Sequence, residues 1–195
     1  RMVRAFEPTP IDRALLTQLV DTASRSPSAG KTQGWSLVVL EGASTETFWS
    51  ATMTAETRSG FRWQHLFAAP VIALSFADPQ AYLDRYAESD KAKTGLGESA
   101  SAWPTPYWTV DASFATMTLL LAAHDAGLGA LFFGVFRGES ELRAALSIPD
   151  RLQLIGALAL GYERSSSDNE PAFTAGASAR RPRASVEQIV HYNAW

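Results

Sequence analysis

Residues 110–136 read VDASFATMTLLLAAHDAGLGALFFGVF and form the longest apolar run of the chain. The run approaches the length of a membrane span, but an aspartate stands near its start and a His-Asp pair interrupts it. Two glycines then break it. The pattern therefore predicts a buried helix over residues 109–126, capped by Gly127, and a buried strand over residues 130–136.

Shorter elements flank this run on both sides. Thr9 can cap a helix whose apolar residues recur every fourth position, and this helix is expected to end near residue 26. Further helices are expected over residues 45–57, 79–86 and 139–146, and further strands over residues 36–41, 70–76 and 152–162. This order of elements predicts an α+β fold in which helices pack on a modest sheet.

No internal repeat or interdomain linker is visible, so residues 1–195 are expected to form a single domain. Residues 164–184 are rich in Ser, Ala, Arg and Pro, and this tail is expected to be extended or to lie over another surface. Residues 88–106 are polar, contain glycine and end in the aromatic cluster WPTPYW, which is typical of a mobile surface loop or lid.

Composition narrows the classes of function. The 195 residues are 46% hydrophobic and 19% charged, and the net charge of −3 gives no basic field for nucleic acid. The absence of cysteine excludes thiolate catalysis and fits a reducing compartment. The three histidines are far apart and offer no metal-ligand spacing, and no signal segment is visible. We expect a cytoplasmic protein that binds no metal, nucleic acid or membrane.

The stretch SPSAGKTQGW, residues 26–35, contains two misleading motifs. Its GKT resembles the end of a phosphate-binding loop, but the required first glycine falls on Arg25, and a helix enters the loop instead of leaving it. Ser28 and Lys31 spell S-x-x-K, a motif of serine acyl enzymes, but Ser28 follows a helix instead of starting one. The Gly-Leu-Gly turn likewise fails the dinucleotide fingerprint, because it follows a helix and lacks the third glycine.

Basic residues gather at the two ends of the chain. Arg1 and Arg4 lie in RMVRAF, and three more arginines, Arg180, Arg181 and Arg183, lie in ARRPRASVEQIV. An arginine fork can bind a phosphate dianion through two hydrogen bonds, so these residues form a phosphate clamp if the two ends meet in space. The alternative is that they are solvated surface charges, and composition alone favours that alternative.

Four segments, in order along the chain, resemble the FMN-dependent nitroreductase family. RMVRAF is similar to the family's N-terminal Arg-Arg-Ser-x-Arg-x-Phe element, and SPSAGKTQGW to its Pro-Ser-x-x-Asn-x-Gln-Pro-Trp loop. Residues 108–136 are similar to its central helix, Gly-Leu-Gly turn and following strand. LSIPDRLQLIGALALGY and ARRPRASVEQIVH are similar to its closing strand and basic tail. The resemblance spans nearly the whole chain, with a looser match over residues 43–107.

The resemblance implies an intertwined homodimer around a mostly antiparallel sheet, with residues 164–195 as an arm on the partner subunit. FMN would lie in the dimer interface. NAD(P)H would deliver a hydride to it, and a small acceptor, such as a nitroaromatic or a quinone, would then use the same slot. The cofactor carries this chemistry, so no catalytic side chain is assigned. The cofactor-binding residues implied are Arg1, Met2, Val3, Arg4, Ser26, Pro27, Ser28, Lys31, Gln33, Phe133, Gly134, Arg180 and Arg181.

Several positions depart from the family's pattern. Met2 stands where Ser is usual, and Lys31 and Gly34 replace the usual Asn and Pro. Lys31 either favours negative charge on the reduced flavin or faces water, and Gln64 is a candidate for a polar flavin contact. These changes motivate an alternative function, an FMN-binding or storage protein with little reductase turnover. The aromatic residues assigned to the substrate side, with packing of the dimer as the alternative, are Trp103, Tyr107 and Trp108.

Overall fold

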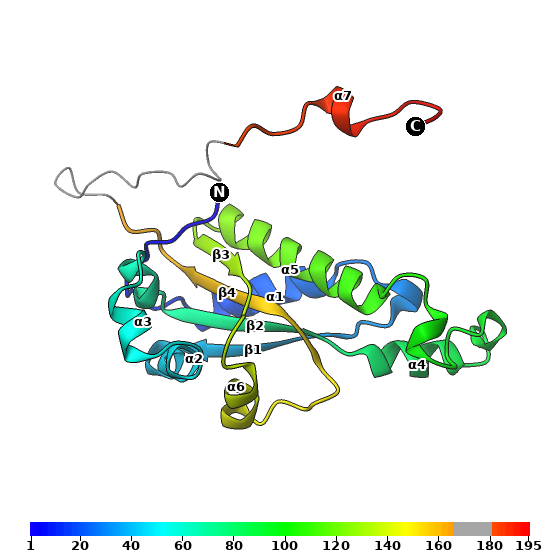
Figure 1. Cartoon of the computed structure of the whole chain (residues 1–195), viewed down its shortest axis with the longest axis horizontal. Coiled ribbons are helices and arrows are strands. Elements are labelled where there is room, and N and C mark those ends of the chain that lie inside the picture. Colours follow the sequence, from blue (N-terminus) through cyan, green and yellow to red (C-terminus); the bar gives the residue numbers. More distant parts are fainter. Residues whose placement is uncertain (166–180) are drawn as a thin grey trace. The chain divides into compact units, whose positions relative to one another are not determined.

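The computed structural model describes residues 1–165 and 181–195, which belong to two units, 1–164 and 165–195. The first unit contains a four-stranded sheet in the order β1 (Trp35–Glu41), β2 (Val71–Ala77), β4 (Gln153–Gly161), β3 (Gly129–Phe133). All neighbouring strands pair antiparallel. The predicted α+β class, with helices flanking an antiparallel sheet, is therefore confirmed (Figure 1).

Helices cover both faces of this sheet. Their bounds are α1 (Arg13–Ser24), α2 (Thr45–Thr52), α3 (Ala55–Ser59), α4 (Pro79–Ala87), α5 (Tyr107–Asp125) and α6 (Glu139–Leu146). The central strand β2 is buried along its whole length and sends alternate residues to opposite faces. Val71 and Ala73 pack in the cluster that α1 and α5 cover, whereas Ile72 and Leu74 pack in the cluster that α2 and α6 cover.

Element boundaries differ from expectation where a local side chain decides them. The first helix begins at Arg13, because the carboxylate of Asp12 accepts the backbone N–H of Ala14 at 2.7 Å and caps it. The expected helix over residues 45–57 is two helices, because Met53 is extended and Thr54 caps a new start. Strand β3 ends at Phe133, three residues earlier than expected.

The second unit is described over residues 181–195. It contains the one-turn helix α7 (Val186–Ile189), which a capping box between Ser185 and Gln188 starts. The larger apolar side chains of this segment are exposed, among them Ile189, Tyr192 and Trp195. The arm role of residues 164–195 and the single domain over residues 1–195 stay predictions. Within the described part of the chain, no helix is both long and apolar enough to cross a membrane.

Candidate functional site

The loop over residues 26–34, here called the 26–34 loop, connects α1 to β1 in an unusual backbone conformation. Gly30, Lys31 and Gln33 all have left-handed backbones, with φ of 62°, 56° and 58°. This region is unfavourable for residues with a side chain, and such strain persists only where surrounding contacts hold it. Strained backbones of this kind cluster at ligand sites, so the loop is a candidate site on geometry alone.

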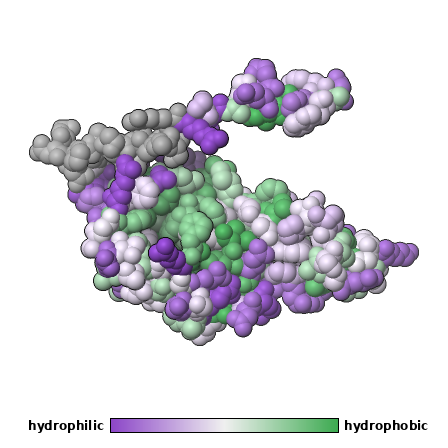
Figure 2. All heavy atoms as spheres, viewed as in Figure 1, coloured by the Kyte–Doolittle hydropathy of each residue, from purple (hydrophilic) through white to green (hydrophobic). Residues whose placement is uncertain are grey.

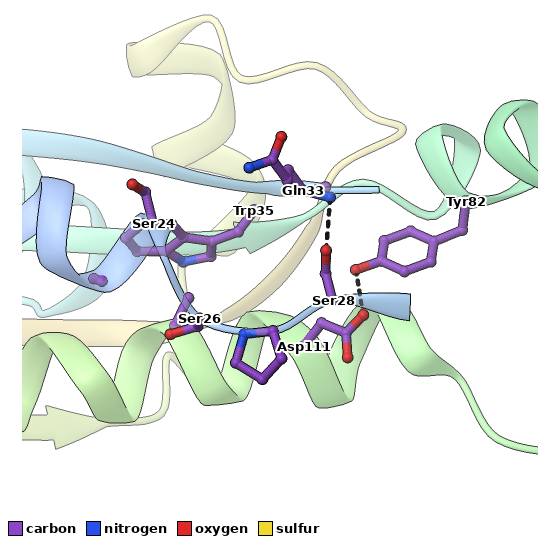
Figure 3. A pocket seen from close by; sticks show the side chains of 11 residues that line it. Ser24, Ser26, Ser28, Gln33, Trp35, Tyr82 and Asp111 are labelled. Atoms are coloured by element: carbon purple, nitrogen blue, oxygen red, sulfur yellow. Dashed lines mark hydrogen bonds between the residues drawn. The ribbon is translucent and has the colours of Figure 1, made fainter. Parts of the chain in front are cut away.

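A buried carboxylate beneath the loop holds it to α5. Asp111 is 6% exposed, and one of its oxygens accepts the backbone N–H of Ala29 at 2.7 Å and the hydroxyl of Tyr82 at 2.8 Å (Figure 3). Burial, and then the hydrogen bond to Asp111, raise the pKa of Tyr82 far above its ordinary value, so the phenol stays a donor. Farther along α5, Thr118 makes a 2.8 Å hydrogen bond with the hydroxyl of Ser26.

A small cavity of about 70 Å³ lies between the loop, the end of α1 and α5. Ser26, Pro27 and Ser28 line it together with Gln33 and Asp111. The Ser28 hydroxyl accepts the backbone N–H of Gln33 at 3.1 Å, and the Gln33 amide points away from Asp111 (Figure 3). Cofactor pockets measure roughly 300–1,000 Å³, so this cavity by itself is too small to hold a cofactor.

Helix α4 clamps the other side of the loop. Arg85 donates from Nε to the carbonyl of Gly30 at 2.9 Å and pairs through its other nitrogens with Glu88 and Asp90. A methyl group on Gly30 would come within 2.9 Å of the Tyr86 ring, so glycine permits this close approach. Lys31 is exposed, and its choice between the flavin and water stays open.

The aromatic residues predicted for the substrate side divide into two groups. Trp103 and Trp108 are each 8% exposed and pack around Tyr82, and their indole N–H groups donate to Leu96 and Gln153. Tyr107 is 42% exposed at the start of α5. Trp103 thus anchors the predicted lid over residues 88–106 to the body of the unit, by packing against Tyr82 of α4 and Trp108 of α5. The substrate role of all three predicted residues stays a prediction.

The N-terminal residues form a second candidate region beside β3. The buried Val3 donates its N–H to Ala130 at 2.9 Å, and the exposed Met2 accepts the N–H of Phe132 on its sulfur at 3.5 Å. Arg1 is exposed and pairs with Glu163. The guanidinium of Arg4 lies 5.2 Å from the centre of the Trp63 ring.

More basic groups join this region than the sequence suggested. Arg62 also lies over the Trp63 ring, and Arg164 hydrogen-bonds His65, whose carbonyl accepts the N–H of Phe6. The sequence signal for these groups is the FRWQH stretch, in which Gln64 was the expected polar contact. That amide nitrogen donates to three backbone carbonyls, of residues 58, 59 and 61, and so stabilises a turn. Arg180 lies outside the described residues, and Arg181 is exposed in the second unit.

Phe133, at the end of β3, is a predicted flavin contact. Its partly buried ring stacks parallel to Trp49 at 6.2 Å and meets Phe48 edge-on, so it packs against the core. The flavin contact stays a prediction. Gly134 is exposed, and the ring of Phe136, itself 93% exposed, lies against it. Phe136 is therefore an exposed aromatic group beside a predicted flavin contact, and the sequence did not single it out.

An apolar stripe runs along the outer face of α5. Phe114, Met117 and Leu121 are 48%, 48% and 57% exposed, and their spacing of three and four residues puts them on one face. Figure 2 shows apolar side chains gathered on the side of the first unit that carries α5 and β3. A helix that is apolar on all sides is typically buried on all sides, so this stripe is expected to meet another surface.

The two candidate regions lie at opposite ends of α5. Asp111 contacts the 26–34 loop near the start of the helix, while the helix ends at Asp125, four residues before the β3 strand that holds Val3 (Figure 1). At 1.5 Å per residue these two aspartates are about 21 Å apart along the axis. The loop and the basic N-terminus of one chain are therefore separated by most of the length of α5.

Comparison with known proteins agrees with this architecture. A curated NADH dehydrogenase of Thermus thermophilus is 28% identical over 180 residues, covering 83% of this chain and 82% of that protein. Two solved structures share the fold: a nitroreductase-like protein from Streptococcus mutans (TM-score 0.73, 16% identity, 98% and 93% of the chains) and an FMN-dependent nitroreductase from Clostridium difficile R20291 (0.65, 18%, 100% and 95%). The model of the nitroreductase family matches residues 1–162, and the chain belongs to the nitroreductase family.

Proposed function

We propose that this chain forms a homodimeric, FMN-dependent NAD(P)H oxidoreductase whose acceptor is a nitroaromatic, a quinone or a similar electron-poor molecule. Family membership supports an oxidoreductase. The observation that carries the finer proposal is the separation of the strained loop from the basic N-terminus by an exposed apolar stripe on α5. A single subunit offers two incomplete halves of a cofactor site.

A twofold axis across α5 would join these halves. In such a dimer the same surface patch meets itself, so the two α5 helices pack antiparallel near Met117. The 26–34 loop of one subunit then lies beside the N-terminal arginines of the other. The stripe is buried at the same time, which removes apolar surface from water. The tail over residues 164–195, with its exposed Val186 and Ile189, would extend onto the partner subunit.

The chemistry of the available groups fits FMN. Arg1 and Arg4 offer guanidinium groups for the phosphate, with Arg180 and Arg181 as further candidates from the tail. The small residues of the 26–34 loop permit close approach of the ring, and Gln33 can donate to its polar edge. FMN, when bound, supplies the hydride chemistry, taking a hydride from NAD(P)H and passing it to the acceptor in a ping-pong sequence. The protein binds the cofactor, orients it and keeps water from its face.

Comparison of FMN with riboflavin tests the phosphate half of this proposal. The quenching of flavin fluorescence on binding gives both dissociation constants. Because hydrogen bonds to charged groups contribute about 1.5–3 kcal/mol, Arg4→Gln is expected to weaken FMN binding by roughly tenfold to a hundredfold. Arg4→Gln should bind riboflavin as tightly as the wild type does. The control Arg137→Gln, at an exposed position, should bind both flavins as the wild type does. Wild-type protein that binds neither flavin would refute the proposal.

Subunit complementation tests whether the site is shared. Arg4→Gln damages the phosphate half, and Gly30→Val damages the loop half, because valine at φ 62° is strained and collides with Tyr86. When the two variants are coexpressed, half of the dimers are mixed, and each mixed dimer has one intact site, so about a quarter of wild-type sites should return. No recovery of tight FMN binding would place both halves in one subunit and contradict the shared site.

A further inference from the structure

We propose that Asp111 is a positioning residue, which fixes the 26–34 loop in the geometry that meets the flavin by accepting the N–H of Ala29. This inference rests on the proposed function for the identity of the ligand. The hydrogen bond between Asp111 and the loop is independent of the proposed function, because it is a contact within one subunit. Asp111 touches neither cofactor nor substrate in this proposal and acts through the loop backbone.

The anchor comes from a buried and well-packed part of the unit. Asp111 lies in the second turn of α5, which packs on α1 and on the sheet, and Tyr82, 1% exposed, comes from α4. The 2.7 Å contact to Ala29 precedes Gly30 and Lys31, the first two left-handed residues of the loop. A carboxylate accepts a backbone N–H more strongly than a neutral oxygen does. It therefore suits a place where an unfavourable backbone has to be held.

Packing alone gives no reason for a carboxylate at this position. Burial of a charge is costly unless donors compensate it, and an apolar side chain would fill the same space without that cost. Here the donors are the phenol of Tyr82 and the N–H of Ala29, and both bond the same oxygen, Oδ2. Tyr82 orients the carboxylate, and the carboxylate holds the loop. The loop is thus held by Asp111, and Asp111 is in turn held by Tyr82, as is typical of a binding loop that is fixed from behind by further hydrogen bonds.

Hydrogen exchange tests the anchor without any flavin. Asp111→Asn keeps the shape of the side chain but replaces the anion with a neutral amide, whose single oxygen accepts the N–H of Ala29 more weakly than a carboxylate oxygen does. Amide exchange of the peptide covering residues 26–34 should become about tenfold faster, with α5 and the sheet unchanged. Asp125→Asn, which removes the same charge from an exposed position of the same helix, should match the wild type. Unchanged exchange in Asp111→Asn would overturn the inference.

Flavin affinity tests what the anchor is for. Asp111→Asn should weaken FMN and riboflavin by the same factor, about tenfold, which corresponds to about 1.4 kcal/mol. An equal loss of affinity for both flavins means that the contacts to the flavin ring are disturbed while the contacts to the phosphate are intact. This is the reverse of the pattern expected for Arg4→Gln. Faster loop exchange with unchanged affinity for both flavins would overturn the positioning role and leave the proposed function standing. A wild-type protein without flavin affinity would refute the proposed function and the cofactor part of this inference, while the exchange result would still decide the anchor.

A second variant removes the donor instead of weakening the acceptor. Ala29→Pro deletes the N–H and puts the proline Cδ in its place, so the Asp111 carboxylate also has to move. The backbone itself accepts proline, because Ala29 begins a 3₁₀ turn and Ser28 before it is extended (φ −141°, ψ 147°). It should weaken both flavins as Asp111→Asn does. In the double variant the two losses should not add, since both substitutions act on the same hydrogen bond. Additive losses, or a wild-type affinity in Ala29→Pro, would show that Asp111 does not act through this N–H. If Asp111→Asn does not fold, this variant alone still decides the question.

Discussion

Replacement of Leu121 by aspartate is expected to dissociate the dimer without unfolding the subunit. Leu121 is 57% exposed in the isolated chain, so a partner would bury roughly half of its side chain. Full burial of a leucine contributes about 1.5–3 kcal/mol, which gives about 1 kcal/mol per subunit and about 2 kcal/mol per twofold interface. The new carboxylates add a desolvation cost of several kcal/mol each when buried. The total is at least about 4 kcal/mol, or roughly a thousandfold in the dissociation constant.

Sedimentation velocity over a range of protein concentrations measures this constant directly. Gln18→Asp, an exposed position on α1, is the control for an added charge and should leave the dimer unchanged. Leu121→Asp should also lose FMN, because each site would lack its second half. A wild-type protein that stays monomeric at high concentration, or a Leu121→Asp variant that dimerises as tightly as the wild type, would refute the proposed use of this stripe.

Three further outcomes follow from the close contacts around the site. Gly30→Ala, strained at φ 62° and 2.9 Å from Tyr86, should cost about 1–2 kcal/mol in the free energy of unfolding and should also weaken FMN binding. The added methyl group of Gly138→Ala would lie 1.9 Å from a backbone carbonyl of α2, at a residue with φ 71°. We expect the free energy of unfolding to fall by at least about 2 kcal/mol, or the melting temperature by roughly 4–8 °C, while the folded protein keeps its FMN affinity. A melting temperature equal to that of the wild type would contradict this expectation. The hydrogen bond from Arg85 lowers the pKa of Asp90 in the folded protein. The stability that this ion pair contributes is therefore present above the unfolded pKa of about 4 and is lost as pH falls through the lowered folded pKa. Proteolysis of residues 88–98 should therefore rise on acidification in the wild type, whereas Asp90→Asn should be cleaved faster already at neutral pH; equal rates at neutral pH would exclude the clamp.

The elements with the strongest periodicity were predicted best. The apolar run over residues 110–136 gave the central helix and the strand after it, because its length, its polar interruption and its glycine turn all act locally. The end of β3 was missed because strand length depends on the partner strand, and pairing with β4 stops at Phe133. The split between α2 and α3 was missed because only two extended residues, Met53 and Thr54, decide it.

The sequence singles out the segments of the candidate site but not the contacts between them. The order of motifs identified the 26–34 loop and the N-terminal arginines, yet nothing local joins Ala29 to a carboxylate 82 residues away. Trp103 reads in sequence as part of a mobile lid, but a hydrogen bond to Leu96 and packing against Tyr82 bury it. Such tertiary contacts override local composition, and only the folded chain reveals them.

Anaerobic half-reactions test the central proposal most directly. Protein saturated with FMN is mixed with NADH or NADPH, and the visible absorbance of the bound flavin is followed; a quinone or a nitroaromatic is then added. The proposed oxidoreductase predicts rapid bleaching with one equivalent of reductant per subunit and full recovery of the absorbance with the acceptor. Tight FMN binding without bleaching by either nucleotide would contradict it and would favour the alternative, a flavin-binding or storage protein of the same fold.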